Sequence, residues 1–319
     1  MSTTTTSTAP PLSATTTAST GTGSPLVMQI IAGCALAHLV NDLIQAVLPS
    51  IYPILKASYG LSFTQIGLIT LTFQLTASLL QPWVGYHTDR HPKPWLLPVG
   101  SICTLVGIIM LAFVGSFGAI LLASALVGIG SSTFHPEASR IARLASGGRF
   151  GLAQSTFQVG GNAGSAFGPL LAAAIIIPYG QTHTAWFGLV ALFSMFVLYR
   201  LSRWYSHHLS LFKLKAGTKA THGLSRRRVT FALVILALLV FSKYFYMTSF
   251  TSYFTFYLIE KFDLSVASSQ LYLFLFLGAV AAGTFFGGPI GDRIGRKAVI
   301  WFSILGAAPF TLALPYTCL

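Results

Sequence analysis

Four polar residues share one face of an apolar segment near the start of the chain. They are His38, Asn41, Asp42 and Gln45, and their spacing of i, i+3, i+4 and i+7 places them on one side of a helix. Ionisable groups are costly in hydrocarbon and normally face the interior of a helical bundle. Asp42 could carry a proton that His38 shares or tunes. Alternatively, the stripe only hydrogen-bonds to neighbouring helices.

A second polar group lies at the end of another apolar run and comprises His135, Pro136, Glu137 and Arg140. Proline permits a kink, and Glu137 and Arg140, at i and i+3, could pair or exchange partners during a conformational change. Alternatively, the helix ends here and the charges meet water. No second ligand cluster of matching spacing accompanies these residues, so we expect no metal site and no cofactor.

A third polar group, Lys243 with Tyr246, lies inside a long apolar segment. A buried ammonium group needs a counter-charge. An anionic solute could supply it, which would indicate an acidic substrate. Asp42 or Glu137 could also supply it, as part of a structural ion pair.

The elements that must position these residues are apolar segments long enough to cross a membrane. The chain is 54% hydrophobic and 8% charged, whereas soluble domains carry about 25% charged residues, so a soluble fold is excluded. A span needs about 20 mostly apolar residues. The sequence predicts nine, over residues 28–50, 62–86, 95–115, 117–137, 151–178, 184–203, 229–258, 265–290 and 298–318.

The net charge of +13 is distributed between these segments. In or beside the connections after even-numbered segments lie 16 of the 19 Lys and Arg residues. By the positive-inside rule, these connections and the N-terminus are cytoplasmic. This pattern predicts a multi-pass membrane protein, surrounded by lipid, and excludes nucleic acid as a partner. We expect a disordered tail over residues 1–26, a six-helix bundle over 27–203, a basic linker over 204–228 and a second, incomplete bundle over 229–319.

A short motif occurs twice, 203 residues apart, after the second segment of each predicted bundle. The first copy contains Gly85, Asp89 and Arg90; the second contains Gly288, Asp292, Arg293, Gly295 and Arg296. The motif resembles the loop signature G-x-x-x-D-R/K-x-G-R-K/R of the major facilitator superfamily. The second copy matches in full, and the first has Pro92 where the second glycine would stand. The resemblance implies an all-α membrane fold of two six-helix bundles, with these loops holding one face closed.

Longer runs resemble drug-resistance members of the same superfamily, among them residues 38–42, 134–137, 158–162 and 241–246. This resemblance implies proton-coupled export of a small phosphonate antibiotic, through a cavity lined by spans one, four, seven and ten. An importer of a small organic anion is a second possibility. A membrane-embedded enzyme or receptor would need a nucleophile–base or metal constellation, which we do not find.

Glycines recur every four residues in the fifth predicted span, at Gly160, Gly164 and Gly168, and Pro169 follows. Such a stripe predicts close helix packing. It also resembles the antiporter signature G-x-x-x-G-P-x-x-G-G, with alanines in place of the last two glycines, which favours export.

Two equal bundles would extend to about residue 410, whereas the chain ends at Leu319. We therefore expect a truncated product that lacks three spans and does not support robust transport alone. The expected partners are a small-molecule substrate and protons, and the expected state is a monomer.

Overall fold

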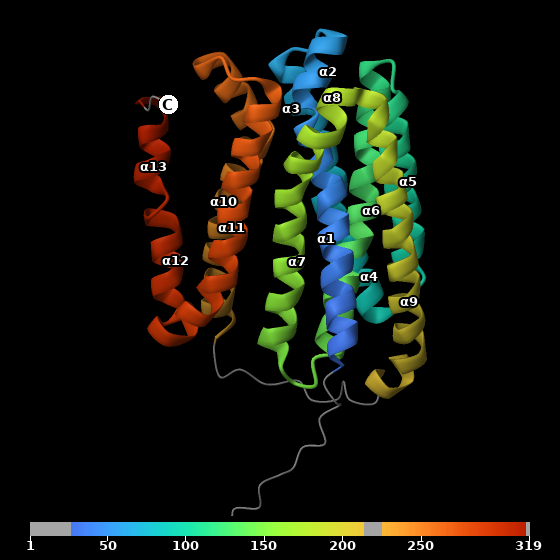
Figure 1. Ribbon diagram of the computed structural model, residues 1–319. Helices are drawn as coiled ribbons and strands as arrows, with labels where there is room; N and C mark the ends of the chain where they lie inside the picture. Colours follow the sequence, from blue (N-terminus) through green and yellow to red (C-terminus); the bar gives the residue numbers. More distant parts are fainter. Residues whose placement is uncertain (1–26, 214–224, 317–319) are drawn as a thin grey trace, which may run out of the picture.

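The computed structural model describes residues 27–213 and 225–316, and every regular element in these two ranges is helical (Figure 1). The predicted all-α fold class is thereby confirmed; the predicted tail over residues 1–26 lies outside the described residues. The α-helices are α1 (Met28–Ser50), α2 (Tyr52–Tyr59), α3 (Phe63–Gln74), α4 (Leu80–Arg90), α5 (Leu96–Phe113), α6 (Phe117–Leu144), α7 (Phe150–Leu171), α8 (Ile177–Tyr179), α9 (Phe187–Lys213), α10 (Arg226–Phe262), α11 (Val266–Ile294), α12 (Arg296–Leu305) and α13 (Ala308–Ala313). Two π-helical turns, Leu75–Leu79 and Ala172–Ile176, join α3 to α4 and α7 to α8.

Eight helical stretches among the described residues are long and apolar enough to cross a membrane. They correspond to the first eight predicted spans. The ninth predicted segment is not one continuous helix in the structure. Helix α12 ends at Leu305, and α13 begins at Ala308 after a turn. Pro309 stands in the first turn of α13, a position where proline is tolerated because its missing N–H needs no partner.

Several helices continue beyond the predicted ends. Helix α6 runs through Pro136 to Leu144, because Ala138, Ile141 and Ala142 extend its buried face at helical spacing. Helix α4 includes the run from Gly85 to Arg90, so the first copy of the repeated motif is helical up to Arg90, and Pro92 follows the helix. The second copy likewise lies mostly within α11.

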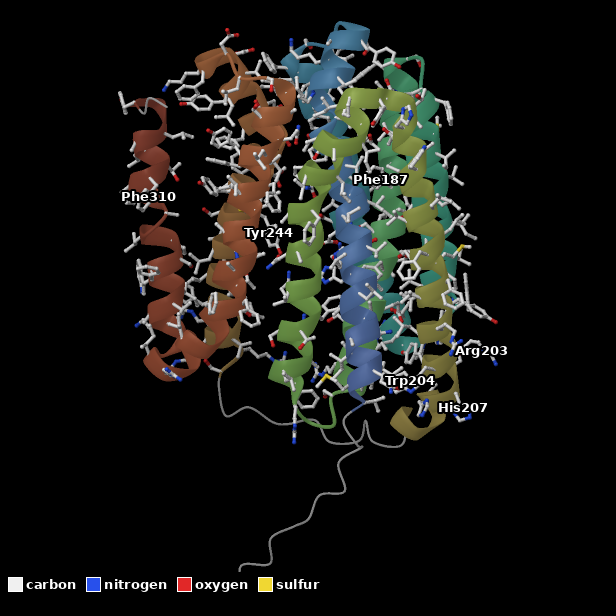
Figure 2. The ribbon with its side chains drawn as sticks, in the orientation of Figure 1. Phe187, Arg203, Trp204, His207, Tyr244 and Phe310 are labelled. Carbon is white, nitrogen blue, oxygen red and sulfur yellow. The ribbon has the colours of Figure 1, made fainter. Side chains whose placement is uncertain are left out.

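The predicted linker over 204–228 is also shorter than expected. Helix α9 continues to Lys213 and α10 begins at Arg226. Residues 214–224, between them, lie outside the described residues. Figure 2 shows Arg203 and His207 at the lower end of α9, on the side of the molecule where α4 and α6 also terminate. We call this side the basic end, because Arg90, Lys93, Arg140 and Arg143 belong to it.

Helices α1 and α7 approach each other closely along the glycine stripe. A Cβ on Gly160 would lie 2.2 Å from the carbonyl oxygen of Ala35, and one on Gly164 would lie 2.0 Å from that of Leu39. Only glycine fits at such positions. This packing brings the polar face of α1 against α7.

The cores of the molecule lie mostly within α1–α9. A large apolar cluster surrounds Ile44, Leu48 and Ile120, and a second surrounds Phe134 and Leu198. Helices α10–α13 form a separate layer that meets the rest mainly where α11 packs beside α7 (Figure 1). That junction contains Ala166, Leu273 and Leu277, with the rings of Phe167 and Phe274 stacked at 6.2 Å.

Polar contacts also join α10 and α11 to the first nine helices, and they lie at the end opposite the basic end. Gln270, fully buried, donates to the carbonyl oxygen of Ser50 at 2.7 Å. The hydroxyls of Thr70 and Ser252 lie 3.2 Å apart, and Tyr52 bonds to the same Thr70 hydroxyl at 2.9 Å.

Candidate functional site

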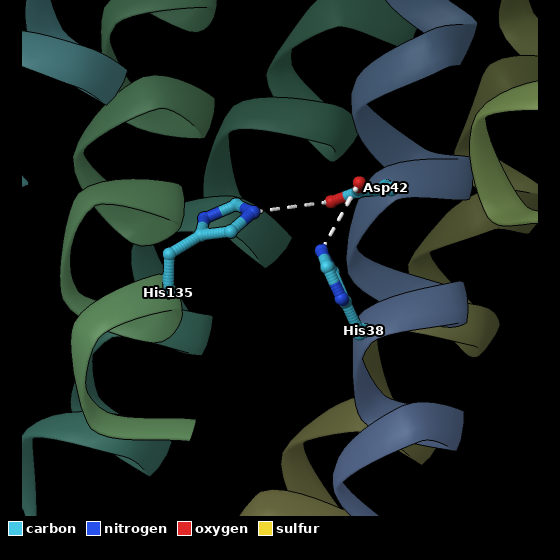
Figure 3. A group of neighbouring side chains, drawn as sticks. All are labelled: His38, Asp42 and His135. Carbon is cyan, nitrogen blue, oxygen red and sulfur yellow. Dashed lines mark ion pairs between the residues drawn. The ribbon is translucent and has the colours of Figure 1, made fainter. Parts of the chain in front are cut away.

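Asp42 lies at the centre of a cluster formed by two helices. Figure 3 shows His38 and Asp42 on α1 and His135 reaching across from α6. His38 Nε2 is 3.3 Å from Asp42 Oδ2, and His135 Nε2 is 3.5 Å from Asp42 Oδ1. His38 is buried, while Asp42 and His135 are partly exposed. The cluster therefore lies inside the bundle and remains open on one side.

Hydrogen bonds to the main chain fix which ring nitrogens carry hydrogen. Nδ1 of His38 donates to the carbonyl oxygen of Phe157 at 2.7 Å, and Nδ1 of His135 donates to that of Ser131 at 3.1 Å. A carbonyl oxygen only accepts, so both Nδ1 atoms are protonated. Both Nε2 atoms then turn toward Asp42. If both imidazoles were neutral and Asp42 ionised, two lone pairs would face a carboxylate.

An additional proton is needed to make the contacts between Asp42 and the two Nε2 atoms attractive. A proton on an Nε2 atom makes that contact a charge-assisted hydrogen bond to Asp42, and a proton on Asp42 lets the carboxyl donate to a neutral Nε2. Whether each contact between Asp42 and an imidazole is attractive thus depends on how many protons the three groups carry. The stacking of the His38 ring on Phe157, with centroids 4.1 Å apart, keeps this geometry in place.

Amide side chains complete the surroundings of Asp42. Asn41 and Gln45 donate to Asp42 Oδ1 at 3.1 and 3.2 Å, and Ser131 on α6 donates to Gln45 Oε1 at 3.1 Å. The other three residues of the predicted stripe thus lie around the carboxyl group of Asp42, which is joined to α6 through Ser131 and His135.

Two contributors escaped the sequence analysis. Ser131 lies one helical turn before His135, so the i, i+4 spacing could have identified it. Gly161 on α7 leaves the space that the pair occupies, because a Cβ there would be 2.3 Å from His38 Nε2 and 2.8 Å from Asp42 Oδ2. Its position within the glycine-rich run does not distinguish it from its neighbours.

The three side chains could also hold a metal ion, since their ligand atoms all lie within 4.8 Å of one another. Two imidazoles and a carboxylate are a common ligand set for transition metals. Asp42 Oδ1 already accepts two amide hydrogen bonds, so Oδ2 is the oxygen that would coordinate such an ion.

A second charged cluster joins α4 to α6 at the basic end. Glu137 is fully buried, and its Oε1 accepts from Arg140 at 2.7 Å. Arg140 also donates to the carbonyl oxygen and hydroxyl of Thr88, at 3.2 and 3.1 Å, and forms an ion pair with Asp89. Nearby, a Cβ on Gly85 would lie in ordinary contact with Pro136, 3.7 Å away. The alternative in which Glu137 and Arg140 meet water at a helix end is therefore wrong for Glu137, because α6 continues past it into buried surroundings.

The remaining predicted site residues lie apart from both clusters. Lys243 on α10 is exposed, and the described ion pairs of Asp42 and Glu137 are made with His38, His135 and Arg140. The structural ion pair considered for Lys243 is thus not formed. Tyr246 accepts a hydrogen bond from Thr311 at 3.1 Å.

In the second motif copy, Gly295 has a positive φ of 91° and Arg293 is exposed. The side chains of Asp292 and Arg296 lie outside the described part, as does the packing around Gly288.

The fold and the sequence together define the class of protein. The family model described as the Major Facilitator Superfamily matches residues 34–319, and the chain belongs to this family of membrane transporters, which are not enzymes. The chain is 60% identical over 290 residues to the fosmidomycin resistance protein of Escherichia coli (strain K12), covering 91% of this chain and 71% of that protein. This confirms the predicted family and the resemblance to a drug-resistance member.

Two further comparisons agree. An uncharacterized MFS-type transporter of Bacillus subtilis (strain 168), YfnC, is 40% identical over 311 residues, or 97% of this chain and 75% of that protein. Among solved structures, the fold is similar to that of a bacterial homolog of the human lysosomal transporter Spinster, in an inward-facing and unoccupied conformation. The TM-score is 0.64 at 17% identity, covering 86% of this chain and 64% of that one. The chain thus spans about two thirds to three quarters of the length of these relatives.

Proposed function

We propose that this chain is built for secondary active transport, in which protons move inward through the cluster around Asp42 while a small anionic drug is exported. One observation carries the proposal: both histidine Nδ1 atoms are held by main-chain carbonyls, so that both Nε2 atoms converge on one carboxyl group. Such a group of three can gain or lose a proton while both imidazoles keep their main-chain hydrogen bonds.

The same cluster is suited to coupling because it links helices. Asp42 lies on α1 and His135 on α6, and Gly161 on α7 allows the pair to sit between them. A change in proton number would alter the attraction between α1 and α6, since each proton converts a repulsive contact into an attractive one. Glu137 is the second candidate proton carrier, because its Oε2 is buried and has no hydrogen-bond partner in the described part of the chain.

The proposed substrate and the proposed direction of transport are based on the E. coli relative. The E. coli protein is named for resistance to fosmidomycin, and a small phosphonate of that kind is an anion. The antiporter-like run from Gly164 to Pro169 also favours export. The alternation of charge favours an orientation with the N-terminus and the basic end in the cytoplasm, and the E. coli relative favours the bacterial inner membrane, where we expect a monomer.

The test combines susceptibility with proton flux. The chain is expressed in fosmidomycin-sensitive bacteria, both alone and fused to the part of the E. coli relative that it does not cover. We expect Asp42→Asn to abolish resistance conferred by the fusion and fosmidomycin-dependent proton flux in proteoliposomes, while insertion in the membrane is unchanged.

Asp263→Asn is the matched control, because this carboxylate is exposed at the end of α10 and should not affect resistance. Retained resistance in Asp42→Asn would remove this residue from the mechanism. Drug uptake driven by the same proton gradient would replace export with import.

A further inference from the structure

A hollow of about 260 Å³ lies between α4, the start of α5 and α6. It is separate from the Asp42 cluster and is lined by different residues. Helices α4 and α5 both pack against α6, and the hollow lies toward the basic end, where α4 terminates and α5 begins. Most of its wall is apolar, with Leu80, Val84, Leu96 and Ile129 among the lining residues.

Two tryptophans border the hollow. Trp83 is 69% exposed and Trp95 is 54% exposed, although exposed tryptophan is costly in water. In a membrane protein, tryptophan at a helix end belongs to the interface, where the ring meets lipid headgroups. The hollow therefore opens where acyl chains meet headgroups, and not into the centre of the hydrocarbon.

The charge at this opening is positive. Lys93 lines the hollow together with His87, whose ring stacks on Trp83 at 6.1 Å. The one carboxylate on the same turn of α4, Asp89, is held by Arg140. Within the described ranges, the ion pairs do not include Lys93. The opening thus presents a cation whose charge is not neutralised by a nearby carboxylate.

From this combination we infer that the hollow binds an anionic phospholipid, with an acyl chain along the apolar wall and the phosphate of the headgroup at Lys93. A basic pocket between membrane helices is suited to phosphate-bearing headgroups, and the long stem of Lys93 lets its ammonium reach the interface. The apolar wall favours a lipid over free phosphate, because a small hydrated anion would gain nothing from it.

Native mass spectrometry of the detergent-purified chain tests the inference. Phosphatidylglycerol and phosphatidylcholine with identical acyl chains are supplied together. We expect the anionic lipid to be retained about five-fold more than the zwitterionic lipid, in keeping with one lysine at a membrane surface. Lys93→Gln should abolish that preference, Lys93→Arg should keep it, and Trp83→Leu should reduce retention of both lipids.

Lys56→Gln is the matched control, since Lys56 also lies beside an aromatic ring, that of Phe63 at 4.7 Å, but at the opposite end. It should leave the preference unchanged. Equal retention of the two lipids, an unchanged preference in Lys93→Gln, or an equal loss in Lys56→Gln would each overturn the inference. Displacement of the lipid by millimolar inorganic phosphate would also overturn it, because the site would then recognise a free anion.

Discussion

Helices α1–α9 and helices α10–α13 are both apolar, but their residues are buried to different extents. In the most apolar windows of Met28–Tyr59 and Phe117–Leu144, half of the residues are buried, whereas in that of Arg226–Phe262 none is. Yet the last of these is the most apolar of the three. Burial in this molecule therefore reflects how many helices surround a segment, and not how hydrophobic the segment is.

The difference decides which polar groups have a defined environment. In the first part, His38 and Ser131 are buried and hydrogen-bond to neighbouring helices, and Glu137 is buried and bonds to Arg140 of its own helix. In the second part, Tyr244 and Phe310 are exposed (Figure 2) and so is Lys243. Substitutions at matched residue types should therefore have large effects in α1–α9 and small effects in α10–α13.

The largest loss is expected for Arg140→Ala, which leaves the carboxylate of Glu137 buried without its partner. Breaking a buried ion pair costs about 3–5 kcal/mol. The melting temperature in detergent, followed by size-exclusion chromatography, should fall steeply. The double variant Arg140→Ala with Glu137→Gln should recover much of the loss, because the uncompensated charge is gone.

Arg90→Ala is the control for that experiment, since Arg90 contacts the exposed ring of Tyr86 and should be nearly neutral. The double variant could instead be as unstable as the single one. In that case Arg140 would stabilise the contact between α4 and α6 through its packing and its bonds to Thr88, and not by neutralising the buried charge.

The next effect is expected at the glycine stripe. Gly164→Ala should destabilise the chain by about 3 kcal/mol, the upper part of the usual range for overpacking, because the new methyl group meets the main chain of α1 and not a flexible side chain. That loss corresponds to roughly 6–12 °C in melting temperature. Gly278→Ala on α11, where a Cβ meets nothing within 4 Å, should leave the melting temperature unchanged or slightly higher. Equal losses in the two variants would show that the close approach of α7 to α1 is not what makes Gly164→Ala destabilising.

A smaller effect is expected for Ser131→Ala, which removes a buried hydroxyl bonded to Gln45. One hydrogen bond contributes about 1 kcal/mol. Ser249→Ala on α10 removes an exposed hydroxyl that bonds only within its own helix, so its melting temperature should not change. If Ser131→Ala were also neutral, the hydrogen bond from Ser131 to Gln45 would not contribute to the stability of the folded chain.

The smallest effect is expected for Lys243→Gln. An exposed lysine without a described ion pair should change stability by less than about 0.5 kcal/mol. A marked fall in the melting temperature would show instead that Lys243 has a counter-charge in the folded chain.

These contrasts also show what the sequence could predict. The polar face of α1 follows from helical spacing, the spans follow from the length of the apolar runs, and the motif is found by its repetition in the sequence. The contact between Asp42 and His135 does not, because it joins two helices 93 residues apart in the chain. Nor do the bonds of Arg140 to Thr88 and Asp89, which depend on α6 continuing past Pro136. Helical periodicity tells which residues share a face, but not which face of another helix they meet.

The hydrogen bonds among Ser50, Gln270, Thr70 and Ser252 limit the share of molecules that are open at the end opposite the basic end. Hydrogen bonds of this kind contribute about 1 kcal/mol each, and together with the bond from Tyr253 to Phe63 at 3.4 Å they make about three at one end. Separating that end would forfeit about 3 kcal/mol, so a conformer that is open there would make up less than about one molecule in a hundred. A ligand that draws the molecule into that conformer would have to bind it at least a hundred-fold more tightly than it binds the closed one.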